Sequence, residues 1–304
     1  GGIPDAPSDN KLYGRKNNAW EEVELDAEDV GALPDDTPLF SGDYDDLSNK
    51  PTIDQLLGNL STLGFVKRTG TNTYGKENNQ YRGKLNGDFT VLEDAIDLGY
   101  RSIDAAVSYS NEAGVGETLA KSKISREDFF ITSKLPINDE YISTKDAVRK
   151  TINNSLKNFH TDYLDLYLIH HPIENKEYFK QTWEVFEEYY KNGKLKSIGV
   201  SNFDEELLNE MKKFATVKPA VNQIPINLKE PNQELIELLK SMEITPVAWG
   251  PMDASGEQIE ALTEIGKAYN KSWAQVLLRY QIQRGIVVIP KSHNKNNQAA
   301  NLDL

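Results

Sequence analysis

Seven short apolar runs, each followed by a polar or aromatic residue, recur between residues 101 and 291. The stretches between them carry apolar residues at helical spacing, so strand and helix signals alternate along this part of the chain. Such alternation predicts an α/β fold, in which parallel strands form a sheet with helices outside it. The runs, each with the residue that follows it, are Arg101–Ile103 before Asp104, Phe129–Ser133 before Lys134, Leu164–Ile169 before His170, Ser197–Val200 before Ser201 and Asn202, Ala220–Asn222 before Gln223, Thr245–Ala248 before Trp249, and Ile286–Pro290 before Lys291.

The strands of a parallel β/α barrel direct their carboxyl ends toward one face, where the chemistry of such barrels collects. We therefore expect the polar residues that follow the seven runs to share one pocket. The first helix is predicted to begin at a cap on Asp88 and to end at Gly99. Later helices are predicted over Thr144–Asn158, Lys180–Lys191, Asp204–Phe214, Asn232–Met242, Gly256–Tyr269 and Trp273–Gln283.

Composition narrows the range of functions. The 304 residues include no cysteine, which excludes disulfides and thiol chemistry. The formal net charge of −13 argues against nucleic acid as a partner. No segment approaches the roughly 18 consecutive apolar residues of a membrane span, so no membrane partner is expected. The four histidines are not spaced as ligands, and no metal is expected.

Residues 1–65 differ in character from the rest of the chain. They hold 14 acidic and 4 basic residues, so most of the negative net charge lies in this region and residues 66–304 are close to neutral. Short patches at residues 12–16 and 19–23 predict small strands joined by turns. The strings at residues 5–23 and 40–52 resemble short modules of bacteriophage tail and fibre proteins. This resemblance implies an attachment region that forms a homo-oligomer or binds phage tail proteins, and a flexible acidic leader is the alternative.

Eight ordered strings between residues 86 and 301 carry a second resemblance. They are Gly99–Ala106, Tyr109–Glu112, Val115–Gly116, Ile131–Lys134, Asp162–His170, Gly193–Phe203, Asn222–Gln223 and Arg284–Ser292. Together they resemble the aldo-keto reductases, which implies a (β/α)8 TIM-type barrel that reduces small aldehydes or ketones to alcohols with NADPH (or NADH). The predicted domains are then the attachment region at 1–65, a linker or altered first strand at 66–87, and the barrel at 88–304.

The chemistry of carbonyl reduction suits four residues in these strings. A carbonyl that accepts hydride develops negative charge on oxygen and needs a proton donor, for which Tyr109 is the candidate. A free phenol has a pKa near ~10, and a nearby Lys134 would lower it. Asp104 would pair with Lys134, and His170 would donate a hydrogen bond to the substrate oxygen. Taken singly, each residue type is more often structural, and only the ordered set favours catalysis.

The resemblance also implies positions that bind the cofactor. Ser201, Asn202 and Gln223 match residues that hold the nicotinamide carboxamide, and Trp249 replaces the tyrosine that usually stacks on the nicotinamide ring. Ordinary turn chemistry is the alternative for the first three. The remaining matches are Gly250, Pro251 and Met252 beneath the pyrophosphate, Lys291 and Ser292 at the adenosine 2′-phosphate, and Asn301 at the adenine.

Several departures from the family leave other functions open. The stretch at 78–83, where the family has its first strand, is polar, and Asn297 stands where the family has an arginine for the 2′-phosphate. The chain ends at Leu304, so we expect no C-terminal substrate loop. The alternatives are a virion tail or receptor-binding protein that uses an impaired barrel as a scaffold, and an artificial or chimeric chain. The expected location is cytoplasmic, or on the virion if the N-terminal resemblance is functional.

Overall fold

A computed structural model describes residues 13–16, 19–22, 74–76 and 89–304, which fall into two units, residues 1–50 and 51–304. In the first unit, β1 (Tyr13–Lys16) pairs antiparallel with β2 (Ala19–Glu22). These two strands lie within the patches at 12–16 and 19–23 where the sequence predicts small strands. The rest of the predicted attachment region lies outside the described residues, so its role stays a prediction.

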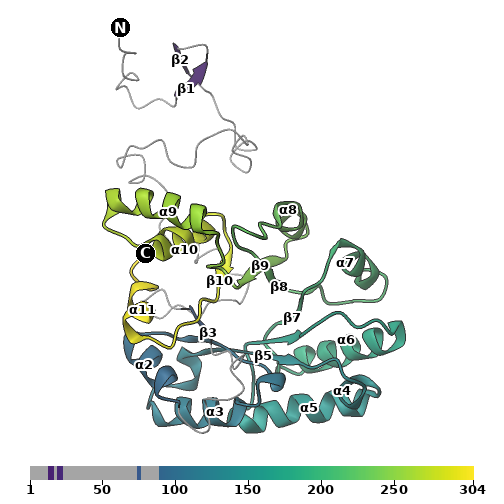
Figure 1. Ribbon diagram of the computed structural model, residues 1–304. Coiled ribbons are helices and arrows are strands. Elements are labelled where there is room, and N and C mark those ends of the chain that lie inside the picture. The colour runs from purple at the N-terminus through teal and green to yellow at the C-terminus, as the bar shows by residue number, and fades with distance from the viewer. Residues whose placement is uncertain (1–12, 17–18, 23–73, 77–88) are drawn as a thin grey trace. The chain divides into compact units, whose positions relative to one another are not determined.

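The second unit is built on a sheet of eight parallel strands that follow one another in chain order (Figure 1). Each of the seven apolar runs forms one of these strands, as predicted. Among the described residues, no ladder joins the first strand to the last. The strands are β3 (Tyr74–Lys76), β4 (Ser102–Asp104), β5 (Phe130–Leu135), β6 (Leu166–Ile169), β7 (Ile198–Ser201), β8 (Val221–Pro225), β9 (Thr245–Trp249) and β10 (Val287–Val288).

The position of β3 shows which residues form the first strand of the sheet. Tyr74 pairs with Ser102 and Lys76 with Asp104, so β3 occupies the sheet edge beside β4. The polar stretch at 78–83, which we aligned with the family's first strand, lies outside the described residues. The first strand that the structure shows therefore falls earlier in the segment 66–87, at only three residues.

Helices connect the strands and lie outside the sheet (Figure 1). Helices α9 and α10 have the predicted bounds because each begins at a reciprocal cap, Ser255 with Gln258 and Ser272 with Gln275. The α-helices are α2 (Thr90–Leu98), α3 (Glu112–Lys121), α4 (Asp139–Ile142), α5 (Lys145–Asn158), α6 (Lys176–Lys191), α7 (Glu205–Met211), α8 (Gln233–Ser241), α9 (Gly256–Tyr269), α10 (Trp273–Gln283) and α11 (Lys295–Ala300). Short 3-10 turns occur at Val107–Tyr109 and Arg126–Asp128.

Two predicted helix starts were wrong. Helix α6 begins at Lys176 instead of Lys180, because the Asn175 side chain accepts hydrogen bonds from the first free amides of the helix. The N-cap of α2 is Phe89 instead of Asp88, whereas its end at Gly99 is confirmed by a left-handed backbone there (φ 106°). Helices α3, α4 and α11 were not predicted at all.

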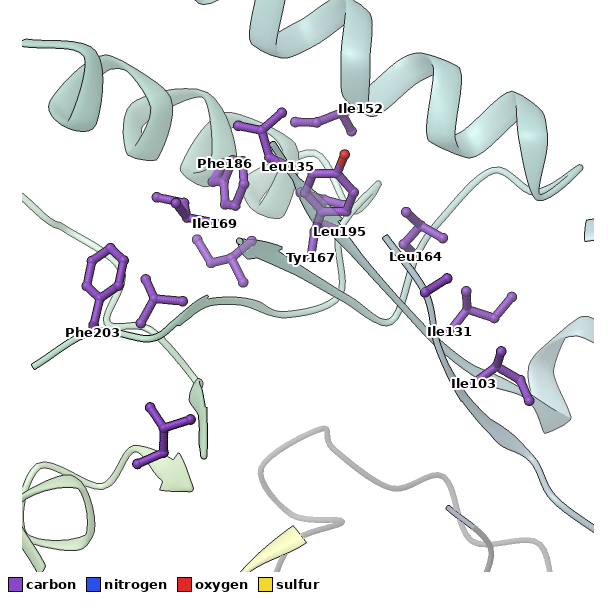
Figure 2. Packing of buried hydrophobic residues seen from close by; sticks show 14 of the residues in the cluster. Ile103, Ile131, Leu135, Ile152, Leu164, Tyr167, Ile169, Phe186, Leu195 and Phe203 are labelled. Carbon is purple, nitrogen blue, oxygen red and sulfur yellow. The ribbon is translucent and has the colours of Figure 1, made fainter. Parts of the chain in front are cut away.

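The core has two layers because successive strand residues point to opposite faces of the sheet. Leu166 and Leu168 of β6 join a small cluster with residues of β5, β8, β9 and β10. Tyr167 and Ile169 belong instead to the large cluster between the sheet and the helices. Figure 2 shows the Tyr167 hydroxyl directed toward the helix that carries Ile152. No helix among the described residues has the length and apolar character needed to cross a membrane.

Helix α3 packs very closely against the end of α5, and Gly116 makes this possible. A Cβ at this position would lie 2.1 Å from the Asn158 carbonyl oxygen and 2.7 Å from the Phe159 Cα. We predict that Gly116→Ala lowers the free energy of unfolding by about 1–3 kcal/mol, measured by urea denaturation, because backbone atoms must move to admit the methyl group. The matched control is Gly256→Ala, whose Cβ meets nothing within 4 Å. Equal stability of the two variants would contradict the prediction.

Candidate active site

The site is organised around a buried ion pair between neighbouring strands. Lys134 of β5 places its Nζ 2.6 Å from Oδ1 of Asp104, the last residue of β4. The same ammonium donates to the Ala105 carbonyl oxygen at 2.8 Å. The exposed fractions of Lys134 and Asp104 are 0% and 3%. An ammonium so far from water is stable only with such partners.

The electrostatic surroundings keep Lys134 charged. Burial by itself lowers the pKa of Lys134, but the charges of Asp104 and Tyr109 and their hydrogen bonds outweigh burial, and the pKa lies above its ordinary value. A pKa that is raised by folding adds stability at all pH values below the ordinary lysine value, and this stability is lost as pH rises through the raised pKa. Lys134 is therefore charged throughout the neutral range.

Tyr109 lies close to this ion pair, at the end of the 3-10 turn after β4. The Lys134 Nζ is 5.1 Å from the centroid of the Tyr109 ring. Burial raises the pKa of Tyr109 and Asp104 raises it further, while the charge and hydrogen bond of Lys134 lower it. The lowering of the Tyr109 pKa by Lys134 is expected from the sequence, but the effect of burial is larger. The net pKa is raised, so Tyr109 is a protonated phenol at neutral pH.

His170 completes the group of four predicted residues. It follows β6, and its ring meets the Tyr109 ring edge to face, with centroids 5.7 Å apart. On its other side it stacks on His171 at 4.6 Å. Burial and the Lys134 charge lower the pKa of His171, which favours a neutral imidazole next to His170. The structure thus brings Asp104, Tyr109, Lys134 and His170 together, and their catalytic roles stay predictions.

Two of the predicted cofactor residues, Gln223 and Asn202, are hydrogen-bonded to this group. Ser201 and Gln223 are register partners on β7 and β8, and Gln223 Nε2 donates to Asp104 Oδ2 at 2.8 Å. Asn202 Nδ2 donates to the His170 carbonyl oxygen at 3.2 Å. Trp249 Nε1 in turn donates to Asn202 Oδ1 at 2.9 Å. Sequence reasoning missed these contacts, since they join residues 32 to 119 positions apart and leave no local signal.

The other predicted cofactor residues follow β9 and β10. Gly250 has a left-handed backbone (φ 59°) with open space where a Cβ would stand, Pro251 is buried, and Met252 packs against the core. Lys291 and Ser292 are partly exposed, whereas Asn301 is buried at the end of α11. Asn297 is exposed on α11. The described part of the chain contains no group of three or more potential metal ligands.

Comparison with known proteins shows the family of this chain. The sequence model of the aldo/keto reductase family matches residues 68–304, which include the whole sheet and the site. The chain belongs to the aldo/keto reductase family. It is 44% identical to a glyoxal reductase of Bacillus subtilis over 69% of this chain and 75% of the relative. It is 34% identical to a methylglyoxal reductase of Escherichia coli over 71% of this chain and 78% of the relative.

Solved aldo-keto reductases share the fold. A structure from Brucella melitensis has a TM-score of 0.66 at 38% identity and covers 70% of this chain and 82% of that protein. A Bombyx mori aldo-keto reductase in complex with NADP has a TM-score of 0.67 at 31% identity, over 76% of this chain and 83% of that protein. The family resemblance inferred from the sequence strings is thereby confirmed for the reductase part of the chain.

The ion pair generates a stability prediction. Asp104→Asn leaves the Lys134 ammonium buried without its counter-charge, and we expect the free energy of unfolding to fall by about 3–5 kcal/mol at neutral pH. Urea denaturation measures the loss. The control is Asp303→Asn, which breaks a surface ion pair with Lys271. The Asp303 side chain is 76% exposed, so this change should alter stability little. The expectation is wrong if the two variants lose similar stability.

Proposed function

We propose that this protein catalyses the NAD(P)H-dependent reduction of small aldehydes or ketones to alcohols. The observation that carries the proposal is the position of Lys134, which is fully buried, paired with Asp104 and 5.1 Å from the Tyr109 ring centroid. A buried cation next to a protonated phenol is suited to proton donation, because it stabilises the phenolate that the donation leaves behind.

Within this proposal each of the four residues has a distinct task. Tyr109 donates its phenolic proton to the carbonyl oxygen as negative charge develops there. Lys134 stabilises the resulting phenolate, and Asp104 holds Lys134 in place. His170, edge to face with Tyr109, donates a hydrogen bond that orients the substrate oxygen.

The residues that would hold NADPH or NADH fit a nicotinamide carboxamide, which offers both a donor and an acceptor. Ser201, Asn202 and Gln223 supply both kinds of group at the carboxyl ends of adjacent strands. Trp249 is partly exposed and offers its indole face for stacking. When bound, the cofactor supplies the hydride. The proposed contacts beyond the nicotinamide are Gly250, Pro251 and Met252 for the pyrophosphate, Lys291 and Ser292 for the 2′-phosphate, and Asn301 for the adenine.

The relatives narrow the substrate class. Curated relatives include a glyoxal reductase and a methylglyoxal reductase, so small α-oxoaldehydes are the proposed substrates. We also propose that β3 completes a (β/α)8 barrel with the seven later strands. The family match from residue 68 and the pairing of β3 with β4 support a reductase unit that includes the segment 66–87. An attachment role for residues 1–65 stays a proposal without further support.

The proposal predicts a separation between binding and rate. Tyr109→Phe should lower kcat for methylglyoxal by about 10²–10⁴-fold, because the phenolic proton is used only in the transition state. The dissociation constant for NADPH should stay nearly unchanged. Turnover is followed by NADPH absorbance, and NADPH binding is followed by tryptophan fluorescence. The variant Trp249→Phe shows whether Trp249 is the ring whose fluorescence responds. Tyr190→Phe, at a tyrosine that is 41% exposed, is the control for rate.

A second prediction concerns the choice between the two nucleotides. Asn297→Arg should strengthen NADPH binding and leave NADH binding nearly unchanged, because a guanidinium can form charge-assisted hydrogen bonds with a 2′-phosphate. Such bonds contribute about 1.5–3 kcal/mol, or roughly a tenfold to hundredfold gain in affinity. Asn296→Arg, which adds the same charge at an exposed neighbour on α11, is the matched control. Binding of neither nucleotide by the unmodified protein at millimolar concentration would end the reductase proposal in favour of the scaffold alternative.

A further inference from the structure

A second buried carboxylate lies near the site and takes no part in the proposed chemistry. Glu112, the first residue of α3, has an exposed fraction of 5%. Its Oε1 accepts hydrogen bonds from Ser133 Oγ at 2.6 Å and Ser155 Oγ at 2.8 Å. Its Oε2 accepts from Asn158 Nδ2 at 3.0 Å. Three donors satisfy this carboxylate, and they come from one strand, β5, and one helix, α5.

The place of Glu112 in the chain connects two parts of the site. It stands three residues after Tyr109, and Ser133 stands immediately before Lys134. Successive side chains of a strand point to opposite faces, so Ser133 faces the helices while Lys134 faces the interior of the sheet. The bond between Glu112 and Ser133 therefore joins the segment that carries Tyr109 to the strand that carries Lys134.

The surroundings leave Glu112 little freedom to move. The close approach at Gly116 fixes α3 against α5 one turn further along the helix. Tyr167 is buried, and its hydroxyl lies 3.2 Å from Ser155 Oγ. Burial and the charge of Glu112 hold the pKa of Tyr167 well above its usual range, so its hydroxyl stays protonated. Because Ser155 directs its one hydroxyl proton to Glu112, the Tyr167 hydroxyl is the donor in its bond with Ser155. Each hydrogen bond among Glu112, Ser133, Ser155, Asn158 and Tyr167 therefore has one defined donor and one defined acceptor.

We propose that Glu112 is a positioning residue for the reduction, and that its hydrogen bond to Ser133 sets the distance between Tyr109 and Lys134. The role in catalysis rests on the proposed function of the site. Lys134 opposes the increase in the pKa of Tyr109 that burial causes, and this effect depends on their separation. If the link is cut, the Tyr109 pKa rises further and proton donation loses its alignment.

Two serine variants separate this role from a general loss of packing. Ser133→Ala removes the bond from Glu112 to the lysine strand, whereas Ser155→Ala removes the bond from the same carboxylate oxygen to α5. Both delete one hydroxyl from a fully buried side chain. We expect Ser133→Ala to lower kcat for methylglyoxal about tenfold to hundredfold with NADPH binding unchanged. Ser155→Ala should keep a kcat close to that of the unmodified protein.

The deciding measurement is the titration of Tyr109 itself, which needs no turnover. Ring-labelled tyrosine gives a carbon NMR signal for Tyr109, which is assigned by its loss in Tyr109→Phe. The midpoint of the Tyr109 titration should move to higher pH in Ser133→Ala but not in Ser155→Ala. Glu112→Gln should shift it in the same direction. Glu187→Gln is the control, because Glu187 is a buried carboxylate that accepts bonds from the Thr216 and Val217 amides elsewhere in the fold.

The outcomes distinguish the two proposals. If Ser133→Ala and Ser155→Ala are folded and shift the Tyr109 titration equally, or not at all, Glu112 does not set this distance and the inference is overturned. If the unmodified protein reduces no carbonyl compound with either nucleotide, the proposed function fails. The Tyr109 titration then still decides whether the link to Ser133 positions the phenol against Lys134.

Discussion

The site depends on the need to neutralise one buried ammonium. Lys134 has no exposed surface, so its charge must be met by groups of the protein, and Asp104 and the Ala105 carbonyl meet it from the neighbouring strand. Moving β4 relative to β5 would separate the charges in a medium that screens them poorly. The ion pair therefore fixes the relation between these strands, and the other parts of the site are arranged around it.

Hydrogen bonds extend this constraint across the carboxyl ends of the strands. Gln223 of β8 shares the Asp104 carboxylate, and Asn202 joins the His170 backbone to the indole of Trp249. Glu112 acts from the other side of the sheet, between α3, α5 and β5. Asp104, Tyr109, Lys134 and His170 thus have hydrogen-bonded neighbours on both faces of the sheet. This arrangement suits a reaction that needs a proton donor held within a narrow range of distances.

The sequence predicted seven of the eight strands because each of these is a short apolar run followed by a polar or aromatic residue, whereas β3 is not an apolar run and its position was not predicted. The helical spacing of apolar residues predicted α9 and α10, and the structure shows why their starts agree, since Ser255 and Ser272 cap them with glutamine partners. The prediction missed α3, whose two glycines and polar residues weaken the helical signal, although Gly116 is there for packing. The sequence also gave no sign of the burial that raises the pKa of Tyr109, since burial is a property of the assembled fold. The bonds of Gln223 and Asn202 were equally invisible, because they span distant strands.

The contact between Trp249 and Asn202 has a consequence for how this site can diverge. Asn202 has a left-handed backbone (φ 62°), which glycine and asparagine tolerate better than other residues. Its side-chain oxygen accepts the indole N–H, a donor that a tyrosine ring does not have at the same place. Exchange of one ring for the other therefore changes the orientation of the amide as well as the stacking surface. A tyrosine at position 249 would leave Asn202 Oδ1 without the indole donor, and the amide would then be held only through its nitrogen, by the contacts with His170, His171 and Ser201.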